Sequence, residues 1–329
     1  MNRFEVITPA DLAHAARLLS GEGHVALAGG VDVIDLLKLD IIAPATLVNL
    51  KNLPELRGIE SRAGGLRIGA LTQLHEVAEH PLIREHYTAV ADAAREAATP
   101  QIRNLATVGG NLLQRPRCWY FRHPDVHCLK KGGDRCYAPG GLNRYHAILG
   151  GGPSFIVHPS NLAPALIAFG ASAKIVGPSG QRSVELEKFF TLPTVDPRRE
   201  NNLEPGEVVV AVELPPPPSG AKSAYLEARE KQSFDWPLVA AAAMLVGAPG
   251  SHTVHDARIV LGAVAPIPWR SPDAEKEIIG HPLDAERARA AGEASVRGAH
   301  PLSDNAYKVA IAKVLVRRAI LKAAGIEET

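Results

Sequence analysis

Apolar positions near the start of the chain switch between helical and strand spacing. Leu12, Ala16 and Leu19 recur at helical spacing and are followed by Gly21. The preceding residues Thr8–Asp11 offer a threonine cap, a proline at the first helical position and an aspartate in the first turn. Three further elements are predicted here: a strand at His24–Ala28, a helix at Asp32–Lys38 and a strand at Thr46–Leu50. The pattern predicts a small α/β unit.

A second region continues to a run of four prolines, Pro215–Pro218. Two strands are expected to pair around the turn Arg62–Gly65, and Thr72 is expected to cap a short helix. The predicted strands are Gly58–Glu60, Leu66–Gly69, Ala173–Gly177 and Val208–Leu214, and the longer predicted helices are Pro81–Ala98 and Asn161–Phe169. Four successive prolines continue neither a helix nor a strand, so they mark the clearest domain boundary in the chain.

The segment after Gly220 has a different pattern. Three strands predict an antiparallel sheet: Ser223–Arg229, Val239–Val246 and Ala257–Val264. Three helices are predicted to follow at Ala274–Ile279, Ala285–Ala291 and Asn305–Ala324. The expected domains are therefore 1–54, 55–216 and 221–329, in an α+β or α/β fold.

Composition narrows the class of protein. The chain has 329 residues, 46% hydrophobic content and a formal net charge of +1, so it can build sizeable cores but offers no basic face for nucleic acid. No apolar run reaches the roughly 18 residues that a membrane-spanning helix needs. The N-terminus lacks the apolar core of a signal peptide. We therefore expect a cytoplasmic protein, or a periplasmic one if a partner subunit that bears a signal exports it.

All three cysteines fall close together, at Cys118, Cys128 and Cys136, shortly after the glycine turn Thr107–Asn111. The stretch is rich in Gly, Pro, Arg and His and has no helical or strand periodicity, so it cannot build a core of its own. Thiolates are the usual ligands of iron–sulfur clusters, whereas compact zinc sites need cysteine pairs two to four residues apart. An iron–sulfur cluster is the favoured interpretation, and three free thiols are the simpler alternative.

Two strand–Gly-Gly–helix turns precede this loop, at Leu27–Asp32 and Thr107–Leu112. Glycine lets the backbone approach a ligand closely, and free N–H groups at such turns bind phosphate oxygens. Neither turn has the glycine spacing of the Rossmann fingerprint. Each turn alone could be an empty tight connection, but the pair could bracket a pyrophosphate.

Taken together, these segments resemble the FAD-binding medium subunits of the molybdenum hydroxylases, the family of xanthine dehydrogenase and carbon monoxide dehydrogenase. The matching segments are Ala28–Asp32, Thr107–Asn111, His158–Pro164, Glu207–Val209 and Ala257–Pro266 with Pro268 and Arg270. The resemblance covers essentially the whole chain. It implies a two-subdomain FAD-binding fold of the vanillyl-alcohol-oxidase (PCMH-like) type, followed by a C-terminal domain with a three-stranded antiparallel sheet and helices.

The resemblance also assigns residues to FAD. They are Leu27, Ala28, Gly29, Gly30, Val31, Asp32, Val33, Ile34, Thr107, Gly109, Gly110, Asn111, Asn161 and Val209. Two positions depart from the family pattern. Asn161 stands where an aspartate is usual, and Glu227 stands where relatives often have lysine or glutamine, so no role is carried onto Glu227.

Within the family, the cysteine loop at 115–154 resembles an insertion found in aldehyde oxidoreductases and in 4-hydroxybenzoyl-CoA reductase. That insertion holds a [4Fe–4S] cluster, which implies Cys118, Cys128 and Cys136 as ligands. Ser154 occupies the position of the fourth cysteine. Three outcomes stay open: Ser154 or an exogenous oxygen completes a [4Fe–4S] cluster, a [3Fe–4S] cluster forms, or another side chain substitutes. The candidate substitutes are His123, His127 and Asp134. Four basic residues are expected to offset the charge of the cluster: Arg117, Arg122, Lys130 and Lys131.

The function implied by the resemblance is electron transfer within a heterotrimer. A large subunit would carry the molybdenum cofactor, and a small subunit with two [2Fe–2S] clusters would pass electrons to FAD here and then to an external acceptor. The alternatives are a stand-alone FAD-dependent oxidoreductase, a subunit of the 4-hydroxybenzoyl-CoA reductase type with reversed electron flow, and a non-enzymatic iron–sulfur or zinc protein. Two phosphate-binding turns speak against the last alternative.

Overall fold

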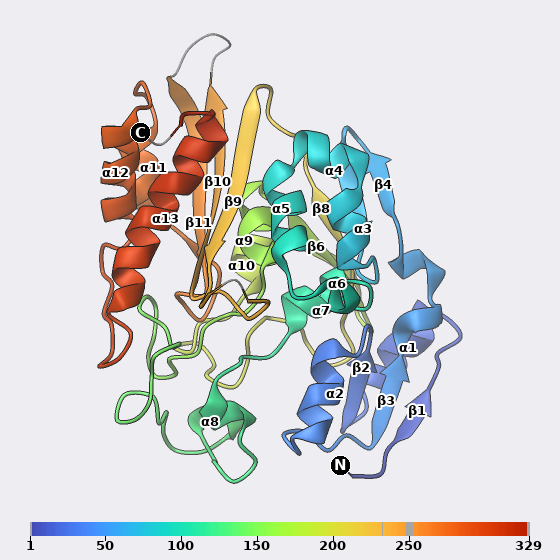
Figure 1. Ribbon diagram of the computed structural model, residues 1–329. Coiled ribbons are helices and arrows are strands. Elements are labelled where there is room, and N and C mark those ends of the chain that lie inside the picture. Colours follow the sequence, from blue (N-terminus) through green and yellow to red (C-terminus); the bar gives the residue numbers. More distant parts are fainter. Residues whose placement is uncertain (1, 232, 248–252, 328–329) are drawn as a thin grey trace.

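The computed structural model describes residues 2–231, 233–247 and 253–327. Three sheets follow one another along the chain, each accompanied by helices (Figure 1). This arrangement confirms the mixed α and β fold predicted from the sequence, with an antiparallel sheet in the C-terminal part.

The first sheet is parallel, with strand order β1-β3-β2. It comprises β1 (Glu5–Ile7), β2 (His24–Leu27) and β3 (Thr46–Asn49), with α1 (Leu12–Leu19) and α2 (Val31–Lys38) as connections. The prediction that Thr8 caps the first helix is wrong. Asp11 is the cap, since its carboxylate accepts the backbone N–H of His14 at 2.6 Å, and α1 begins one residue later.

The second sheet has five antiparallel strands in the order β4-β5-β8-β6-β7. They are β4 (Ile59–Arg62), β5 (Gly65–Gly69), β6 (Ser172–Gly177), β7 (Gly180–Glu185) and β8 (Val208–Leu214). Strand β7 was not predicted, because its residues are mostly polar and exposed and give no apolar signal. The apolar strand β8 lies at the centre, where both of its faces are covered.

Short helices accompany this sheet, except α8, which lies apart from it in the cysteine loop (Figure 1). They are α3 (Leu74–Glu79), α4 (Pro81–His86), α5 (Thr88–Glu96), α6 (Pro100–Arg103), α7 (Val108–Leu113), α8 (Trp119–Arg122), α9 (Leu162–Ala168) and α10 (Leu186–Phe189), with single 3₁₀ turns at Leu50–Asn52, Pro54–Leu56 and Leu129–Lys131.

Two helix predictions in this region are wrong. The helix expected at Pro81–Ala98 is broken at Tyr87, whose hydroxyl donates to the Pro215 carbonyl at 2.7 Å and whose ring packs on Phe169. Thr72 does not cap α3, because Gln73 and Glu76 form a capping box there while the Thr72 hydroxyl donates to Gly58.

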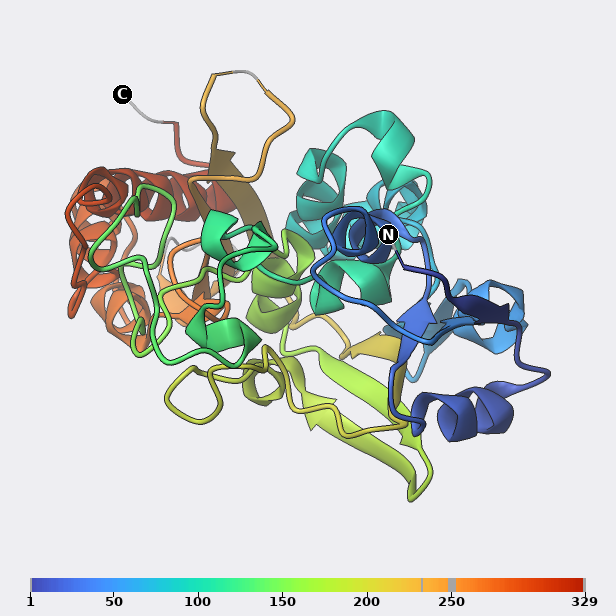
Figure 2. The same cartoon turned by 90° about the horizontal axis from the view of Figure 1, so that it is seen from below.

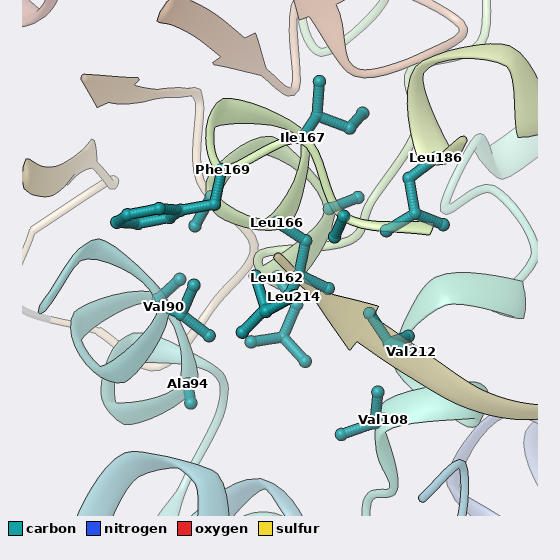
Figure 3. Packing of buried hydrophobic residues seen from close by; sticks show 14 of the residues in the cluster. Val90, Ala94, Val108, Leu162, Leu166, Ile167, Phe169, Leu186, Val212 and Leu214 are labelled. Carbon is teal, nitrogen blue, oxygen red and sulfur yellow. The ribbon is translucent and has the colours of Figure 1, made fainter. Parts of the chain in front are cut away.

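The main core lies between the five-stranded sheet and helices α5 and α9. Figure 3 shows Val90 and Ala94 of α5 facing Leu162 and Leu166 of α9, with Val212 of β8 and Val108 of α7 beside them. Val108 is only 1% exposed, so its burial anchors the turn that starts α7. The second glycine turn is therefore fixed by the core.

The C-terminal sheet is antiparallel, with strand order β12-β11-β10-β9. It comprises β9 (Ala221–Ala228), β10 (Val239–Gly247), β11 (Val254–Gly262) and β12 (Trp269–Arg270), with α11 (Pro272–Ile278), α12 (Ala285–Ala294) and α13 (Tyr307–Ala324). The sheet has four strands, so the prediction of three is wrong. The sequence did not predict β12, because it has only two residues and leaves no periodic signal. Among the described residues, no helix is both long and apolar enough to cross a membrane.

The cysteine loop runs between the N-terminal and C-terminal parts of the molecule. In Figure 2, which is seen from below, this green segment lies in front of and beside the orange and red C-terminal helices. Asn143 fixes the loop to the C-terminal domain: its Nδ2 donates to the Ser303 hydroxyl at 2.8 Å, and its Oδ1 accepts the Asp304 N–H. The loop is thus ordered by contacts with distant segments.

Candidate functional site

A cavity of about 1130 Å³ opens between the first sheet and the five-stranded sheet. Both predicted glycine turns line it, as do Asn161 and Val209. The predicted FAD residues on its wall are Ala28, Gly29, Gly30, Val31, Asp32, Val33, Thr107, Gly109, Gly110, Asn111, Asn161 and Val209. Leu27 ends β2 and Ile34 is 44% exposed, and neither lies on this wall. The binding role of each residue stays a prediction.

The first turn presents backbone donors to the cavity. Gly30 is the N-cap of α2 with φ of +82°, a conformation that glycine adopts without strain, and no side chain caps the helix. The N–H groups of the first helical turn therefore have no partner within the helix. Together with the helix dipole they form a site suited to an anion such as a pyrophosphate.

The two turns are packed against each other. A Cβ on Gly29 would lie 2.0 Å from the carbonyl oxygen of Leu105, which leads directly into the second turn. In that turn the Thr107 hydroxyl accepts the Gly110 N–H at 3.1 Å and caps α7. Close approach of two backbones thus places both glycine turns on one side of the cavity.

Asn111 lines the cavity, and hydrogen bonds hold its side chain in a fixed orientation. Its Oδ1 accepts bonds from the Ser160 hydroxyl at 2.6 Å and the Leu162 N–H at 3.3 Å. Because the oxygen is already engaged, the amide can offer a ligand only its Nδ2 donors. The His158–Pro164 segment therefore acts on the cavity through Asn111 as well as through Asn161.

Asp32 lines the cavity and also contacts the cysteine loop, which the sequence did not predict. Its carboxylate accepts the Arg117 guanidinium at 2.5 Å, the Arg122 guanidinium at 2.7 Å and the Arg115 N–H at 2.7 Å, all from the cysteine loop. Burial alone would raise the pKa of Asp32, but the two guanidiniums outweigh it and hold this pKa below its usual value. The carboxylate thus joins the first glycine turn to the cysteine loop.

Asn161 lies in a buried polar network that the sequence did not reveal. Its Nδ2 donates to Glu227 at 2.9 Å, and Glu227 also accepts the Tyr225 hydroxyl at 2.7 Å and forms an ion pair with Arg229. Burial raises the pKa of Glu227 despite these donors. The two departures from the family pattern, Asn161 and Glu227, are therefore physically linked. The Asn161 amide donates to the Glu227 carboxylate, whereas an aspartate at position 161 would place a second carboxylate against it.

Replacing Asn161 with aspartate should destabilise the chain, because two carboxylates would meet at the position of the present hydrogen bond. The double variant Asn161→Asp/Glu227→Gln restores a carboxylate–amide pair with the partners exchanged. We expect the double variant to lose less unfolding free energy than the two single variants lose together. The difference, measured in a double-mutant cycle, should be about 2 kcal/mol. Strictly additive effects would contradict this coupling.

Further residues that the sequence did not assign to the site line the cavity, among them Phe234, Asp235 and Trp236. The Trp236 ring lies 4.4 Å from the Arg117 guanidinium carbon, and 47% of the residue is exposed. A local pattern could not have placed these residues there, because they lie in an irregular connection between β9 and β10.

The thiols of the cysteine loop lie in one neighbourhood. Cys118 and Cys128 pack around Phe121, and Cys128 is 5% exposed. Burial raises the pKa of the Cys118 thiol to about 12, and the charges of Cys128 and Cys136 add to this effect. Ser154 is also buried, whereas His123 has a side chain that is 59% exposed.

The described part of the chain contains no group of three His, Cys, Asp or Glu side chains close enough to hold a metal ion. A preformed site for a single ion such as zinc is therefore not supported. A four-iron cluster spreads its ligands over the corners of a cube, further apart than the ligands of one ion. The iron–sulfur cluster stays a prediction, with a donor set of one buried thiol, Cys128, and two partly buried thiols, Cys118 and Cys136.

The basic residues of the loop do not stand free to offset a cluster charge, contrary to expectation. Arg117 and Arg122 pair with Asp32, and Lys130 pairs with the buried Glu200 at 2.7 Å. Lys131 donates to the His123 carbonyl. A buried ammonium or guanidinium needs a partner, and carboxylates outside the loop supply it for three of the four.

The cavity fits a dinucleotide such as FAD. The uncapped N-terminus of α2 at the first glycine turn suits a pyrophosphate, and apolar residues such as Val209 and Leu71 suit a flat ring system. The backbone N–H groups of Val108, Gly109 and Gly110 already have partners, so the second turn adds no free backbone donor. Its volume exceeds the roughly 300–1,000 Å³ typical of drug-sized ligands, as an extended dinucleotide requires. Fold and site together define a dinucleotide-binding class of protein.

Comparison with known families makes this assignment specific. Residues 2–217 match the model described as the FAD binding domain in molybdopterin dehydrogenase. Residues 223–323 match the CO dehydrogenase flavoprotein C-terminal domain. The chain belongs to this family and is an FAD-binding subunit of a molybdenum-hydroxylase-type oxidoreductase.

Individual relatives span nearly the whole chain. The aldehyde oxidoreductase FAD-binding subunit PaoB of Escherichia coli K12 is 37% identical over 94% of this chain and 93% of its own length. The carbon monoxide dehydrogenase medium chain of Hydrogenophaga pseudoflava is 29% identical over 97% and 96%, respectively. Two solved structures cover 98% of both chains: carbon monoxide dehydrogenase of H. pseudoflava, with a TM-score of 0.77 at 27% identity, and quinoline 2-oxidoreductase of Pseudomonas putida 86, with 0.76 at 26%.

Proposed function

We propose that this chain is the FAD- and [4Fe–4S]-containing electron-transfer subunit of a heterotrimeric, molybdenum-dependent aldehyde-type oxidoreductase. It would relay electrons from the [2Fe–2S] clusters of a small subunit to an external acceptor, while a large subunit with the molybdenum cofactor oxidises the substrate. The similarity to PaoB supports the aldehyde type. The name medium chain, carried by the H. pseudoflava relative, supports membership of a complex.

One observation carries the proposal: the cysteine loop and the FAD cavity form one structural unit. Arg115 and Arg117 line the cavity, and Arg117 immediately precedes Cys118. The ion pairs of Asp32 with Arg117 and Arg122 hold the loop against the first glycine turn. A redox group on the three thiols would therefore lie beside the flavin site, as a relay requires.

The chain's own residues would bind FAD, orient it and exclude water. Backbone N–H groups of the first turn would hold the pyrophosphate, and the Nδ2 of Asn111 would donate to a ligand oxygen. Bound FAD supplies reversible electron acceptance, which is the chemistry of the cofactor itself. Around Cys118, Trp119 and Tyr120 lie against His146 and shield the thiol from water.

For the cluster we propose Cys118, Cys128 and Cys136 as thiolate ligands, with Ser154 or an exogenous oxygen at the fourth iron. A [3Fe–4S] cluster on three thiolates is the alternative, because an alkoxide is a harder and weaker ligand for iron. The proposed location is the cytoplasm, or the periplasm if a signal-bearing partner carries the complex across the membrane.

Replacing Cys128 with alanine, whose side chain cannot ligate iron, tests the cluster. We expect the variant complex to lose the iron and sulfide of this subunit while it keeps about one FAD per chain, because Cys128 is not part of the cavity wall. Iron, sulfide and flavin analysis of the purified chain, beside its visible spectrum, measures both. Unchanged iron content would refute the ligand assignment, and three iron atoms per chain in the unmodified protein would indicate the open cluster.

A further inference from the structure

The buried side chain of His146 has no role in the function described so far. It is 3% exposed, and its Nε2 lies 3.2 Å from the Sγ of Cys118. The ring is held by Trp119 and Tyr120, with centroids 5.5 Å and 6.1 Å away. The His146 imidazole therefore packs against two aromatic rings, and its Nε2 faces the Cys118 sulfur.

The backbone of His146 is held just as firmly from the C-terminal domain. Its carbonyl accepts the Nδ2 of Asn305 at 3.1 Å and the Nζ of Lys308 at 3.2 Å. Asn305 is 0% exposed and Lys308 is 1% exposed, so these are interior bonds. The position of the imidazole relative to Cys118 is therefore built into the packing between the loop and α13.

The charge state of the sulfur decides the direction of the hydrogen bond between His146 and Cys118. Within the described part of the chain, Nε2 faces the Cys118 sulfur, and a backbone group of Asn143 also acts on the ring. A thiolate that ligates iron has no proton and can only accept a hydrogen bond. A hydrogen bond to a ligating Cys118 sulfur therefore requires the ring proton on Nε2.

The short distance between His146 Nε2 and Cys118 Sγ also distinguishes two possible roles of His146: ligand of an iron atom, or hydrogen-bond donor to a ligating sulfur. In a four-iron cluster each iron takes one protein ligand, so two ligands on different irons lie well apart. A nitrogen at hydrogen-bond distance from the Cys118 sulfur is too close to serve as the ligand of a neighbouring iron. The geometry fits a donor to the ligating sulfur and leaves the fourth position as proposed above.

We infer that His146 is a positioning residue that donates its Nε2–H to the Cys118 thiolate and raises the reduction potential of the cluster. This inference rests on the proposed cluster. Reduction adds one electron from the small subunit to the cluster, while the proton stays on Nε2. A hydrogen bond to a ligating sulfur draws off negative charge and so stabilises the reduced state, and such bonds are one of the means by which proteins set cluster potentials.

The test is a redox titration of the assembled complex, followed by the electron paramagnetic resonance signal of this cluster. We expect His146→Leu to disfavour reduction about tenfold, which is a shift of about 59 mV to more negative potential for a one-electron couple. His146→Gln, whose amide can donate to the same sulfur, should restore most of the shift. His86→Leu is the control, because His86 lies on α4, outside the cysteine loop, and has a side chain that is 45% exposed. An unchanged potential in His146→Leu overturns the inference.

A second measurement does not depend on how well the variants fold. In the unmodified complex with ¹⁵N-labelled histidine, a weak nitrogen coupling together with an exchangeable proton coupling to the reduced cluster is expected. A strong coupling, typical of a nitrogen bound to iron, or no coupling at all, would overturn the inference while the proposed cluster stands. Absence of iron and sulfide from the unmodified subunit would overturn the proposed cluster itself, and this inference with it.

Discussion

Replacing Gly29 with alanine should abolish FAD binding. The added Cβ would lie 2.0 Å from the Leu105 carbonyl oxygen and 3.0 Å from its carbon, so backbone must move on one side or the other. Overpacking of this kind costs about 1–3 kcal/mol, and the movement displaces the first turn, which we assign to the pyrophosphate, from its contact with the second. The flavin content of the purified chain, measured against protein, should fall from near one to near zero.

The matched control is Gly140→Ala. No atom lies within 4 Å of a Cβ at Gly140, and its backbone does not need the left-handed conformation. This variant should keep its full flavin content and stability. Full flavin content in Gly29→Ala, with unchanged affinity, would show that the contact between the two turns is irrelevant to binding.

The glycine turns could be predicted from the sequence because their signal is local. A strand followed by two glycines and a helix start is visible within a few residues at Leu27–Asp32, and Gly29 and Gly110 lie on the same cavity wall. The strand predicted before the second pair of glycines is wrong, because Gly109 and Gly110 lie within α7 and no strand directly precedes that helix. The helix caps were less certain, because several residues near a helix start can compete for the same free N–H groups. Asp11 is the cap at the first helix, although Thr8 and Pro9 form the more familiar pattern.

The partners of the buried charges could not be predicted, because they come from distant parts of the chain. Asp32 pairs with residues 85 and 90 positions away, and Asn161 bonds to Glu227 at a separation of 66. Pairing of this kind depends on the tertiary fold and leaves no periodic trace. The same holds for His146, whose contact with Cys118 depends on a loop that has little secondary structure of its own.

These distant contacts explain how a loop without its own core can be ordered. Its start is tied to α2 through Asp32, its middle to Glu200 through Lys130, and its end to the C-terminal domain through Asn143 and His146. Each of these ion pairs and hydrogen bonds connects the loop that carries the thiols to a different part of the fold. Removing one of them should therefore destabilise both the loop and the distant element that it contacts.

Replacing Asp32 with asparagine should have the largest effect on stability of any single polar change in the site. The side chains of Asp32, Arg117 and Arg122 are 17%, 18% and 9% exposed, so the variant leaves two largely buried guanidiniums facing a neutral amide. Removing one partner of a buried ion pair typically costs about 3–5 kcal/mol. Chemical denaturation of the complete chain should show a loss of about this size, with reduced retention of FAD because the first turn loses its support.

Asp35→Asn is the matched control on the same helix. Asp35 also pairs with Arg122, at 2.8 Å, but its side chain is 52% exposed, and exposed pairs contribute about 0–1 kcal/mol. The pH dependence gives a further check on the ionic origin of the effect. The pKa of Asp32 is held below the ordinary value of 3.8, so its contribution is complete above that pH and is lost as the pH falls through the lowered pKa. The stability difference between the unmodified chain and Asp32→Asn should therefore be constant at neutral pH and shrink only in strong acid. A difference that stays unchanged in strong acid would mean that the carboxylate acts through its shape and not its charge.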